Sequence, residues 1–292
     1  MEARARFTSN GGLQRGDRWA VPLLDARRGG PAERFAFRLP RHHPAAVFLA
    51  AILAGLAALV LIAIALGLLV TDVLLDAGGL ARTDDRAVTS LVAERTPFLT
   101  DVSEVGSALG GAPLLPILVG TIALVCALLR KWRIAAFAVF VLTVESATYR
   151  ITSLAVPRER PEVKRLDELP ANDSFPSGHT AASVAVYVGL ALLITSRFPN
   201  RGVRLLATAV AILVPVFVAF ARMYRGMHHP LDVAGGFVVG IGALLVLLFA
   251  CRAAGVAHQA RSPQRAGLPG VARSPPHECA GRPDPPRAGQ RR

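Results

Sequence analysis

The sequence predicts an all-α membrane protein with six transmembrane helices. Of the 292 residues, 52% are hydrophobic and only 18% are charged, and the mean hydropathy is +0.44. The apolar residues also gather in long runs, and a helix needs about 20 mostly apolar residues to cross the roughly 30 Å hydrocarbon core of a bilayer. Because soluble domains are usually less apolar than this, a membrane protein is expected.

Six apolar runs meet or approach the length of a span. In chain order they are residues 45–70, 113–129, 134–149, 180–195, 205–220 and 231–250. The first run contains no charged residue, and the polar stretch 71–111 that follows it predicts an external loop with short amphipathic helices. The third run contains Glu145, either a functional acid or the buried partner of Arg150 or Arg222. We favour the pairing, because ionisable groups inside a membrane are usually paired.

Charge and composition divide the chain into three segments. We expect residues 1–43 to be a disordered Arg-rich tail, residues 44–251 to be the six-span domain with its motifs within 150–235, and residues 252–292 to be a disordered tail rich in Pro, Arg and Gly. Most of the net charge of +13 lies in the tails, where it suits anionic lipid headgroups. Nucleic acid is not an expected partner, because no aromatic-interleaved basic face accompanies the charge.

The short loops predict the orientation, because Lys and Arg are retained on the cytoplasmic side of a membrane. The turns after the second and fourth spans carry Arg130, Lys131, Arg133, Arg197, Arg201 and Arg204. Six spans place both turns on the same side as the two Arg-rich tails. We therefore expect a multi-pass plasma-membrane protein with both termini in the cytoplasm and with the loops 151–178 and 221–230 facing outward.

Three polar clusters lie in or beside these outward loops. They are residues 157–161 (Pro-Arg-Glu-Arg-Pro), 174–180 (Ser-Phe-Pro-Ser-Gly-His-Thr) and 222–232 (Arg-Met-Tyr-Arg-Gly-Met-His-His-Pro-Leu-Asp). The second cluster opens a predicted helix, where free N–H groups and the helix dipole favour an anion. Arg160 and Arg222 offer guanidinium groups whose geometry fits phosphate oxygens. The clusters together predict an anion site at the membrane surface.

A histidine and a carboxylate in the third cluster have the spacing of a reactive pair. Asp232 lies one helical turn after His228, so its carboxylate is expected to hold one imidazole nitrogen and leave the other free as a nucleophile or base. His229 does not fit this spacing. With His179 as a second histidine, the residues suffice for phosphoryl transfer without a metal.

At these residues the sequence resembles the superfamily of type-2 phosphatidic-acid phosphatases and vanadium haloperoxidases. The family pattern is Lys-x6-Arg-Pro, then Pro-Ser-Gly-His, then Ser-Arg-x5-His-x3-Asp. It is met here by Arg160-Pro161, by residues 176–179 and by Arg222-x5-His228-x3-Asp232. The likeness covers residues 113–250, and the six-span arrangement is similar to the membrane branch of the family. The resemblance implies a phosphatase that acts on a lipid phosphate whose tails remain in the bilayer.

The resemblance also implies a role for each matched residue. His228 would attack phosphorus to form a phosphohistidine, and Asp232 would orient its ring. His179 would protonate the leaving lipid oxygen and then activate water. The phosphoryl group would be stabilised by Arg160, Arg222, Ser177 and the backbone of Gly178. No metal or other cofactor is implied.

Two positions depart from the family pattern. The family Lys falls on Ser153, which supplies no cation. Arg150 or Arg158 is expected to restore the charge, and a weakened site is the alternative. The Ser before the third-motif Arg is Ala221, which removes one hydrogen bond.

The sequence leaves several functions open. A phosphatidic-acid-like phosphomonoester and undecaprenyl (polyprenyl) diphosphate both suit an outward site, the latter in envelope-lipid recycling. A catalytically weakened membrane scaffold or accessory protein is an alternative of another class, favoured by Ser153. Cys126, Cys251 and Cys279 share no CxxC spacing, so neither zinc nor a disulfide framework is predicted. The sequence does not indicate the oligomeric state.

Overall fold

The computed structural model describes residues 21–39, 43–76, 79–168 and 173–261, and the regular structure within these ranges is helical. In chain order the helices are η2 (Pro22–Leu24), α1 (Pro31–Phe37), α2 (Pro44–Leu69), η3 (Val70–Leu74), α3 (Leu80–Ala93), α4 (Pro97–Gly110), α5 (Leu114–Leu128), α6 (Trp132–Ala155), α7 (Gly178–Ser183), η4 (Val184–Val188), α8 (Gly189–Arg197), α9 (Arg201–Tyr224) and α10 (Pro230–Arg261). The predicted all-α membrane fold is confirmed.

Five continuous helices in the described ranges are long and apolar enough to cross a bilayer, and a bent pair of helices completes a set of six. The five are Pro44–Leu74, Trp132–Ala155, Gly178–Arg197, Arg201–Tyr224 and Pro230–Arg261. The predicted second span corresponds to α5, whose 15 residues make a helix of about 22 Å, too short to cross alone. Helix α4 precedes α5 at a bend of 40°. Part of the predicted external loop therefore belongs to this span.

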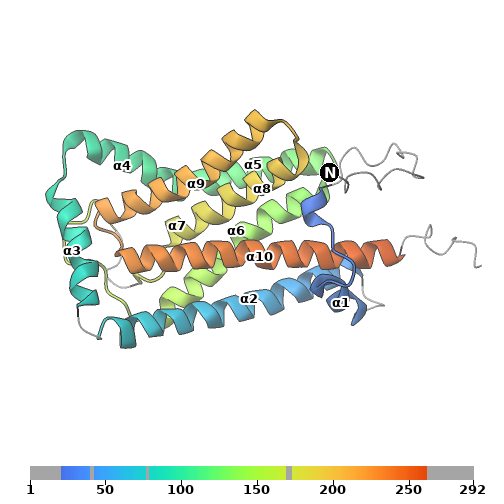
Figure 1. Cartoon of the computed structure of the whole chain (residues 1–292), viewed down its shortest axis with the longest axis horizontal. Helices are drawn as coiled ribbons and strands as arrows, with labels where there is room; N and C mark the ends of the chain where they lie inside the picture. The colour runs from blue at the N-terminus through green and yellow to red at the C-terminus, as the bar shows by residue number, and fades with distance from the viewer. Residues whose placement is uncertain (1–20, 40–42, 77–78, 169–172, 262–292) are drawn as a thin grey trace, which may run out of the picture.

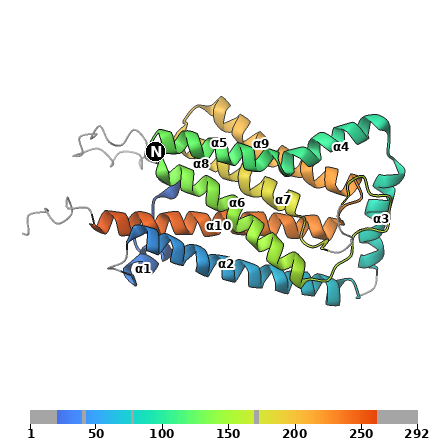
Figure 2. The ribbon, with the colours of Figure 1, turned by 180° about the vertical axis from the view of Figure 1, so that it is seen from behind.

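Helix α10 is the axis of the bundle. It packs against α1, α2, α6 and α7, and Figures 1 and 2 show it running the length of the molecule. The core between α2, α6 and α10 is built from apolar side chains such as Leu59, Phe137 and Leu247. Helices on several sides of α10 explain why its sequence shows no polar face.

A glycine of α10 brings α7 into backbone contact with it. A Cβ atom added to Gly236 would lie 2.6 Å from the carbonyl oxygen of Ser177 and 3.0 Å from Thr180 Cβ. Only a residue without a side chain allows so close an approach. The contact holds the start of α7 against the first turns of α10, which places the second and third polar clusters side by side.

The inner parts of both predicted tails are helical, although the sequence predicts disorder there. Helices η2 and α1 lie within residues 1–43, and α10 continues to Arg261, ten residues beyond the predicted domain end at 251. Apolar burial is the physical reason, since Leu24, Ala32 and Ala36 are buried in the core. Arg252 Nε also donates to the Leu23 carbonyl at 3.0 Å. Residues 1–20 and 262–292 lie outside the described residues.

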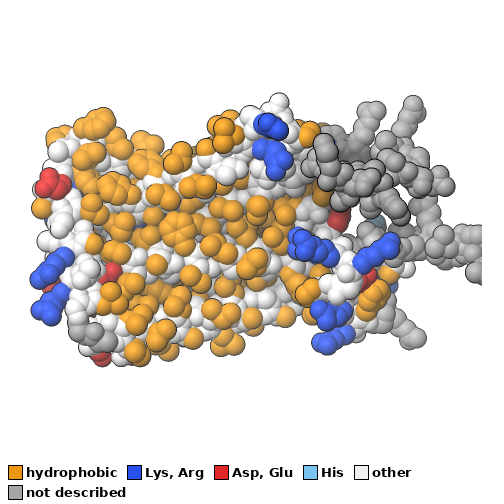
Figure 3. Space-filling model, viewed as in Figure 1, with side chains coloured by type: hydrophobic (Ala, Val, Ile, Leu, Met, Phe, Trp, Pro, Cys, Tyr) orange, Lys and Arg blue, Asp and Glu red, His pale blue; other side chains and the backbone are white. Residues whose placement is uncertain are grey.

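An apolar belt covers the middle of the molecule. Figure 3 shows hydrophobic side chains across its centre and charged side chains near its two ends. Leu53, Leu61, Leu205 and Leu213 are each at least 65% exposed, and so large an apolar surface matches hydrocarbon rather than water. The α5–α6 and α8–α9 turns lie at the end where α1 and the last turns of α10 meet, whereas α3 crosses the opposite end (Figure 1).

Candidate active site

The three polar clusters meet at the end of the bundle that α3 crosses. The first two lie in or beside the loop between α6 and α7, and the third joins α9 to α10 (Figures 1 and 2). Backbone hydrogen bonds connect them, from Ser174 N to the Arg158 carbonyl at 3.0 Å and from Ser177 N to the Asp232 carbonyl at 2.9 Å. Main-chain hydrogen bonds therefore connect segments that are up to 75 residues apart in the sequence, without help from side chains.

The ring of His228 is fixed by a backbone carbonyl. Its Nδ1 lies 2.8 Å from the Ser174 carbonyl oxygen, which can only accept a hydrogen bond, so Nδ1 carries the ring proton. Nε2 is then unprotonated and accepts a hydrogen bond from Arg160 Nη1 at 3.3 Å. Burial, the largest effect, lowers the pKa of His228 to about 4 although Asp232 opposes this shift. At neutral pH the imidazole is therefore neutral, with its proton on Nδ1 and none on Nε2, as a nucleophile requires.

Asp232 supports His228 less directly than its spacing predicts. The distance from Asp232 Oδ2 to His228 Nδ1 is 3.8 Å, which is too long for a hydrogen bond. Oδ2 instead accepts from Ser174 Oγ at 2.6 Å and from His229 N at 2.8 Å. The carboxylate thus holds Ser174, whose own carbonyl meets the His228 ring.

The two arginines considered as substitutes for the family Lys lie in different surroundings. Arg158 is 5% exposed and forms ion pairs with Asp84 of α3 and, at 2.8 Å, with Asp232. Arg150 has a side chain that is 63% exposed and lies 4.0 Å from an Asp173 oxygen. Ser153 is buried and donates to the Arg150 carbonyl. Arg158 thus brings a buried positive charge to the site, held between two carboxylates.

Replacing Asp84 with Ala should destabilise the protein strongly, because it removes one of these carboxylates and leaves Arg158 buried beside only one. Breaking a buried ion pair costs about 3–5 kcal/mol, which corresponds to a fall in the melting temperature of roughly 6–20 °C. Asp85→Ala is the matched control, since Asp85 is 67% exposed where it pairs with His229 and exposed pairs contribute about 1 kcal/mol or less. Thermal unfolding of the detergent-purified variants measures both; equal melting temperatures would contradict the assigned role of Arg158.

A cavity of about 280 Å³ joins the catalytic candidates to the apolar part of the bundle. Arg160, Gly178, His179 and His228 line its polar end, and residues of α5 and α6 such as Leu115 and Leu142 line the remainder. Some of the lining residues, including Pro116 and Ser146, are exposed on the side of the bundle. The cavity therefore opens at the surface of the transmembrane belt.

His179, in the first turn of α7, and Arg160, in the loop between α6 and α7, both line this cavity. A Cβ atom added to Gly111 would lie 2.7 Å from His179 Nε2, so a glycine at position 111 leaves room for the imidazole. Arg160 Nη1 donates to the Met227 carbonyl at 2.7 Å, and Nη2 donates to the Asp173 carbonyl at 3.2 Å. Burial lowers the pKa of Arg160, but a guanidinium remains charged in proteins.

Arg222 lies beside this group and is held by residues that the sequence does not single out. Its side chain is 1% exposed, and Nη1 donates to Asp167 Oδ2 and to Ser107 Oγ, each at 2.6 Å. Asp167 also accepts two hydrogen bonds from Arg225. Burial raises the pKa of Asp167, but hydrogen bonds and charges from Arg225 and Arg222 outweigh it and lower the pKa overall. Asp167 is therefore ionised and balances two arginines.

Two N–H groups of Arg222, Nε and Nη2, have no hydrogen-bond partner among the described residues although they are buried. Unsatisfied buried donors are unfavourable and rare, so they indicate a place for an anion. Ser177, the last of the predicted phosphate-binding residues, is fully buried at the start of α7, with its Oγ 3.0 Å from Thr180 Oγ1. In the described ranges no group of three or more His, Cys, Asp or Glu side chains is arranged to hold a metal ion.

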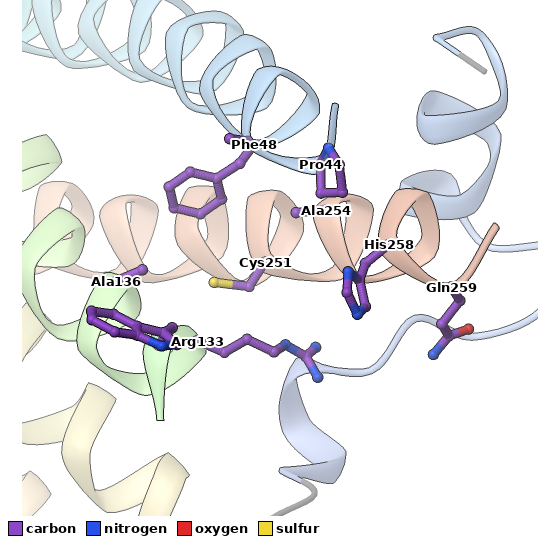
Figure 4. Close-up of a pocket in the computed structure, with 11 residues that line it drawn as sticks. Pro44, Phe48, Arg133, Ala136, Cys251, Ala254, His258 and Gln259 are labelled. Atoms are coloured by element: carbon purple, nitrogen blue, oxygen red, sulfur yellow. The ribbon is translucent and has the colours of Figure 1, made fainter. Parts of the chain in front are cut away.

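A second cavity, of about 390 Å³, lies at the opposite end of the molecule. Figure 4 shows it between Phe48 of α2, Ala136 of α6 and Cys251 of α10, with Arg133 and His258 at its polar edge. None of the residues in the three polar clusters lines it. The catalytic candidates therefore belong to the smaller cavity.

Part of the chain is similar in sequence to known proteins. Residues 139–254 match the PAP2 superfamily. The chain is 34% identical over 73 residues to phosphatidylglycerophosphatase B of Bacillus subtilis (strain 168), covering 23% of this chain and 34% of that protein. It is also 34% identical over 93 residues to the putative undecaprenyl-diphosphatase YbjG of Escherichia coli (strain K12), covering 30% of this chain and 42% of that protein. The matched segments thus span less than half of either relative.

A solved structure shares the fold. The crystal structure of the first transmembrane PAP2-type phosphatidylglycerolphosphate phosphatase from Bacillus subtilis superposes with a TM-score of 0.53 and 24% sequence identity. The superposition covers 70% of this chain and 93% of that chain. The likeness extends beyond the matched motifs to most of the helical bundle.

Proposed function

Because residues 139–254 match the PAP2 superfamily, we propose that the protein hydrolyses a lipid phosphate without a metal, through a phosphohistidine on His228. One observation carries the proposal: the unprotonated Nε2 of His228 lies at the polar end of a cavity that also holds His179 and Arg160. The apolar remainder of that cavity suits a lipid. The preferred substrate is a phosphatidic-acid-like phosphomonoester.

The reaction proceeds in two steps. His228 Nε2 attacks phosphorus, the bond from phosphorus to the lipid oxygen breaks, and His179 donates a proton to that oxygen so that the alcohol leaves. A water molecule then gives a proton to His179 and attacks phosphorus, which breaks the N–P bond and releases inorganic phosphate. Arg160, Arg222 and the start of α7 stabilise the negative charge in both transition states.

Undecaprenyl diphosphate is the second candidate substrate, and the relative named as a putative undecaprenyl-diphosphatase favours it. A catalytically weakened scaffold is the candidate of another class, and Ser153 in place of the family Lys favours it. The buried charge of Arg158 argues for an active enzyme, because it lies within the same network as Asp232.

The protein lies in the plasma membrane with both termini in the cytoplasm and the active site outside. Support comes from the Lys- and Arg-rich turns α5–α6 and α8–α9, which share one end of the bundle with α1 (Figure 1), because positive loops remain cytoplasmic. Hydrolysis of a membrane-impermeant phosphate ester by intact spheroplasts but not by sealed inverted vesicles is the expected result. The opposite pattern would reverse the orientation.

A lipid panel tests the proposed reaction. Purified protein in EDTA should release phosphate from phosphatidic acid or undecaprenyl diphosphate, detected with malachite green, and vanadate should inhibit competitively as a mimic of the transferred group. The better substrate of the two identifies the lipid class. A scaffold would neither release phosphate nor bind vanadate at this site, and a requirement for added metal would contradict the mechanism.

A further inference from the structure

Glu145 lies near the middle of α6 with unfilled hydrogen-bonding capacity. Its side chain is 1% exposed. Oε2 accepts a hydrogen bond from Ser146 Oγ at 3.1 Å, whereas Oε1 has no partner among the described residues. The arginines that the sequence offers as partners are engaged elsewhere, Arg222 with Asp167 and Arg150 near Asp173. The predicted Glu145–arginine pair is therefore absent from the described structure.

This carboxyl group lines the cavity that holds the catalytic residues. Glu145 and Tyr149 of α6 border it together with His179 and His228. The Tyr149 ring lies at the phosphate end, because a Cβ atom added to Gly178 would be 3.0 Å from it. Glu145 is one helical turn, or about 6 Å, farther along α6. When the phosphate of a lipid contacts His228, the first lipid atoms beyond the phosphoester oxygen therefore lie beside Glu145.

The chemistry of the Glu145 carboxyl group limits which groups of a lipid can form a hydrogen bond with it. Buried polar groups inside a membrane are unfavourable and usually functional. A hydroxyl group both donates and accepts, so it satisfies this acid in either ionisation state. An ester carbonyl can only accept, and a polyprenyl chain has no hydrogen-bonding group beyond its phosphates.

We propose that Glu145 is a specificity residue that binds a free hydroxyl group close to the phosphoester of the lipid. The site would then select hydroxyl-bearing lipid phosphomonoesters over prenyl phosphates. A pocket built to bind a substrate hydroxyl rejects an analogue that lacks it, because its own polar group is left unpaired. This inference rests on the proposed lipid-phosphatase function and narrows the phosphatidic-acid-like class to phosphomonoesters with a free hydroxyl, such as the one-chain (lyso) form; phosphatidic acid itself carries an ester at its second carbon and lacks that group.

Two lipids that differ by one hydroxyl group test the inference. One is 1-acyl-glycerol 3-phosphate, and the other is the same acyl chain on propane-1,3-diol phosphate, which lacks only the hydroxyl at the second carbon. Wild-type protein should prefer the first by about ten-fold or more in kcat/KM, the effect of one buried hydrogen bond. Glu145→Leu should bring the ratio to about one. Glu145→Gln should retain most of the preference, because an amide also bonds a hydroxyl.

Thr143→Val is the matched control, since Thr143 is exposed on α6 and donates to the Val139 carbonyl at 2.9 Å. It should keep the wild-type ratio. No preference in the wild type, or an equal loss for both lipids in Glu145→Leu, would overturn the inference. The rise in melting temperature that each lipid gives the wild type and Glu145→Leu provides the same comparison without turnover. Absence of phosphate release would then reject the proposed reaction, while these lipid-induced shifts still decide the role of Glu145.

Discussion

His228→Ala should abolish phosphate release, with kcat falling by about 10⁴-fold or more, because removal of a nucleophile leaves only binding and charge stabilisation. Membrane insertion should be unaffected, since His228 lies in the turn between α9 and α10. Alanine has no group that replaces the unprotonated Nε2, which the hydrogen bond at Nδ1 keeps available in the wild type.

The covalent intermediate gives this prediction a specific measurement. Wild-type protein quenched in alkali after mixing with ³²P-labelled lipid should carry acid-labile, base-stable label, and His228→Ala should carry none. His258→Ala serves as the control, because His258 lies about 40 Å along α10 from the start of that helix and lines the other cavity. Labelling of His228→Ala at the wild-type level would assign the nucleophile to another residue.

His179→Ala should reduce lipid hydrolysis by about 10²–10⁴-fold, the usual contribution of a general acid and base. The loss should depend on the leaving group, because an acid is needed only where the departing oxygen is strongly basic. An alkyl lipid alcohol needs a proton, whereas p-nitrophenolate leaves without one. The first step should therefore be much less impaired with p-nitrophenyl phosphate than with lipid.

A pre-steady-state experiment separates the two roles of His179. With p-nitrophenyl phosphate, the variant should release a burst of p-nitrophenolate and then stall, because His179 is also the base that activates water. The burst should equal the amount of enzyme. An equal loss of rate for both substrates, with no burst, would indicate that His179 positions other groups rather than transferring a proton.

The spacing of residues in the sequence predicted which side chains lie together in the candidate site, but not which contacts fix their positions. The register of Arg222, His228 and Asp232 favours His228 over His229, and of these two histidines the structure places His228 on the cavity. The Ser174 carbonyl that fixes its ring comes from a loop 54 residues earlier. Backbone carbonyls carry no sequence signature, so this contact could not be predicted.

The charged partners missed by the sequence have a similar origin. Asp84 and Asp167 lie in an external helix and in a loop, where acidic residues are common and usually solvated. Asp84 is buried because α3 crosses the end of the bundle, and Asp167 is partly buried because its loop folds over Arg222. For Glu145, helix geometry argues against one expected pairing, because Arg150 is five residues away and thus about 140° around the helix.

The bend in the second span, between α4 and α5, could be seen in the sequence. Gly110 is the last residue of α4, and Gly111 and Pro113 lie between α4 and α5; glycine and proline interrupt helices. The apolar run after Pro113 is long enough to suggest a complete span by composition alone. Hydropathy therefore located the part of this span that α5 forms, but not α4, the helix with which the span begins.

The contact at Gly236 joins the two halves of the proposed catalytic centre through main-chain atoms. His179 and His228 sit on segments whose main chains touch there, so their relative placement does not depend on rotamers in a packed layer. A tilt of α7 in response to a thinner or thicker bilayer would carry the beginning of α10 with it. The two proposed catalytic histidines, His179 and His228, would therefore move together as a rigid unit, while the outer helices adapt to the membrane.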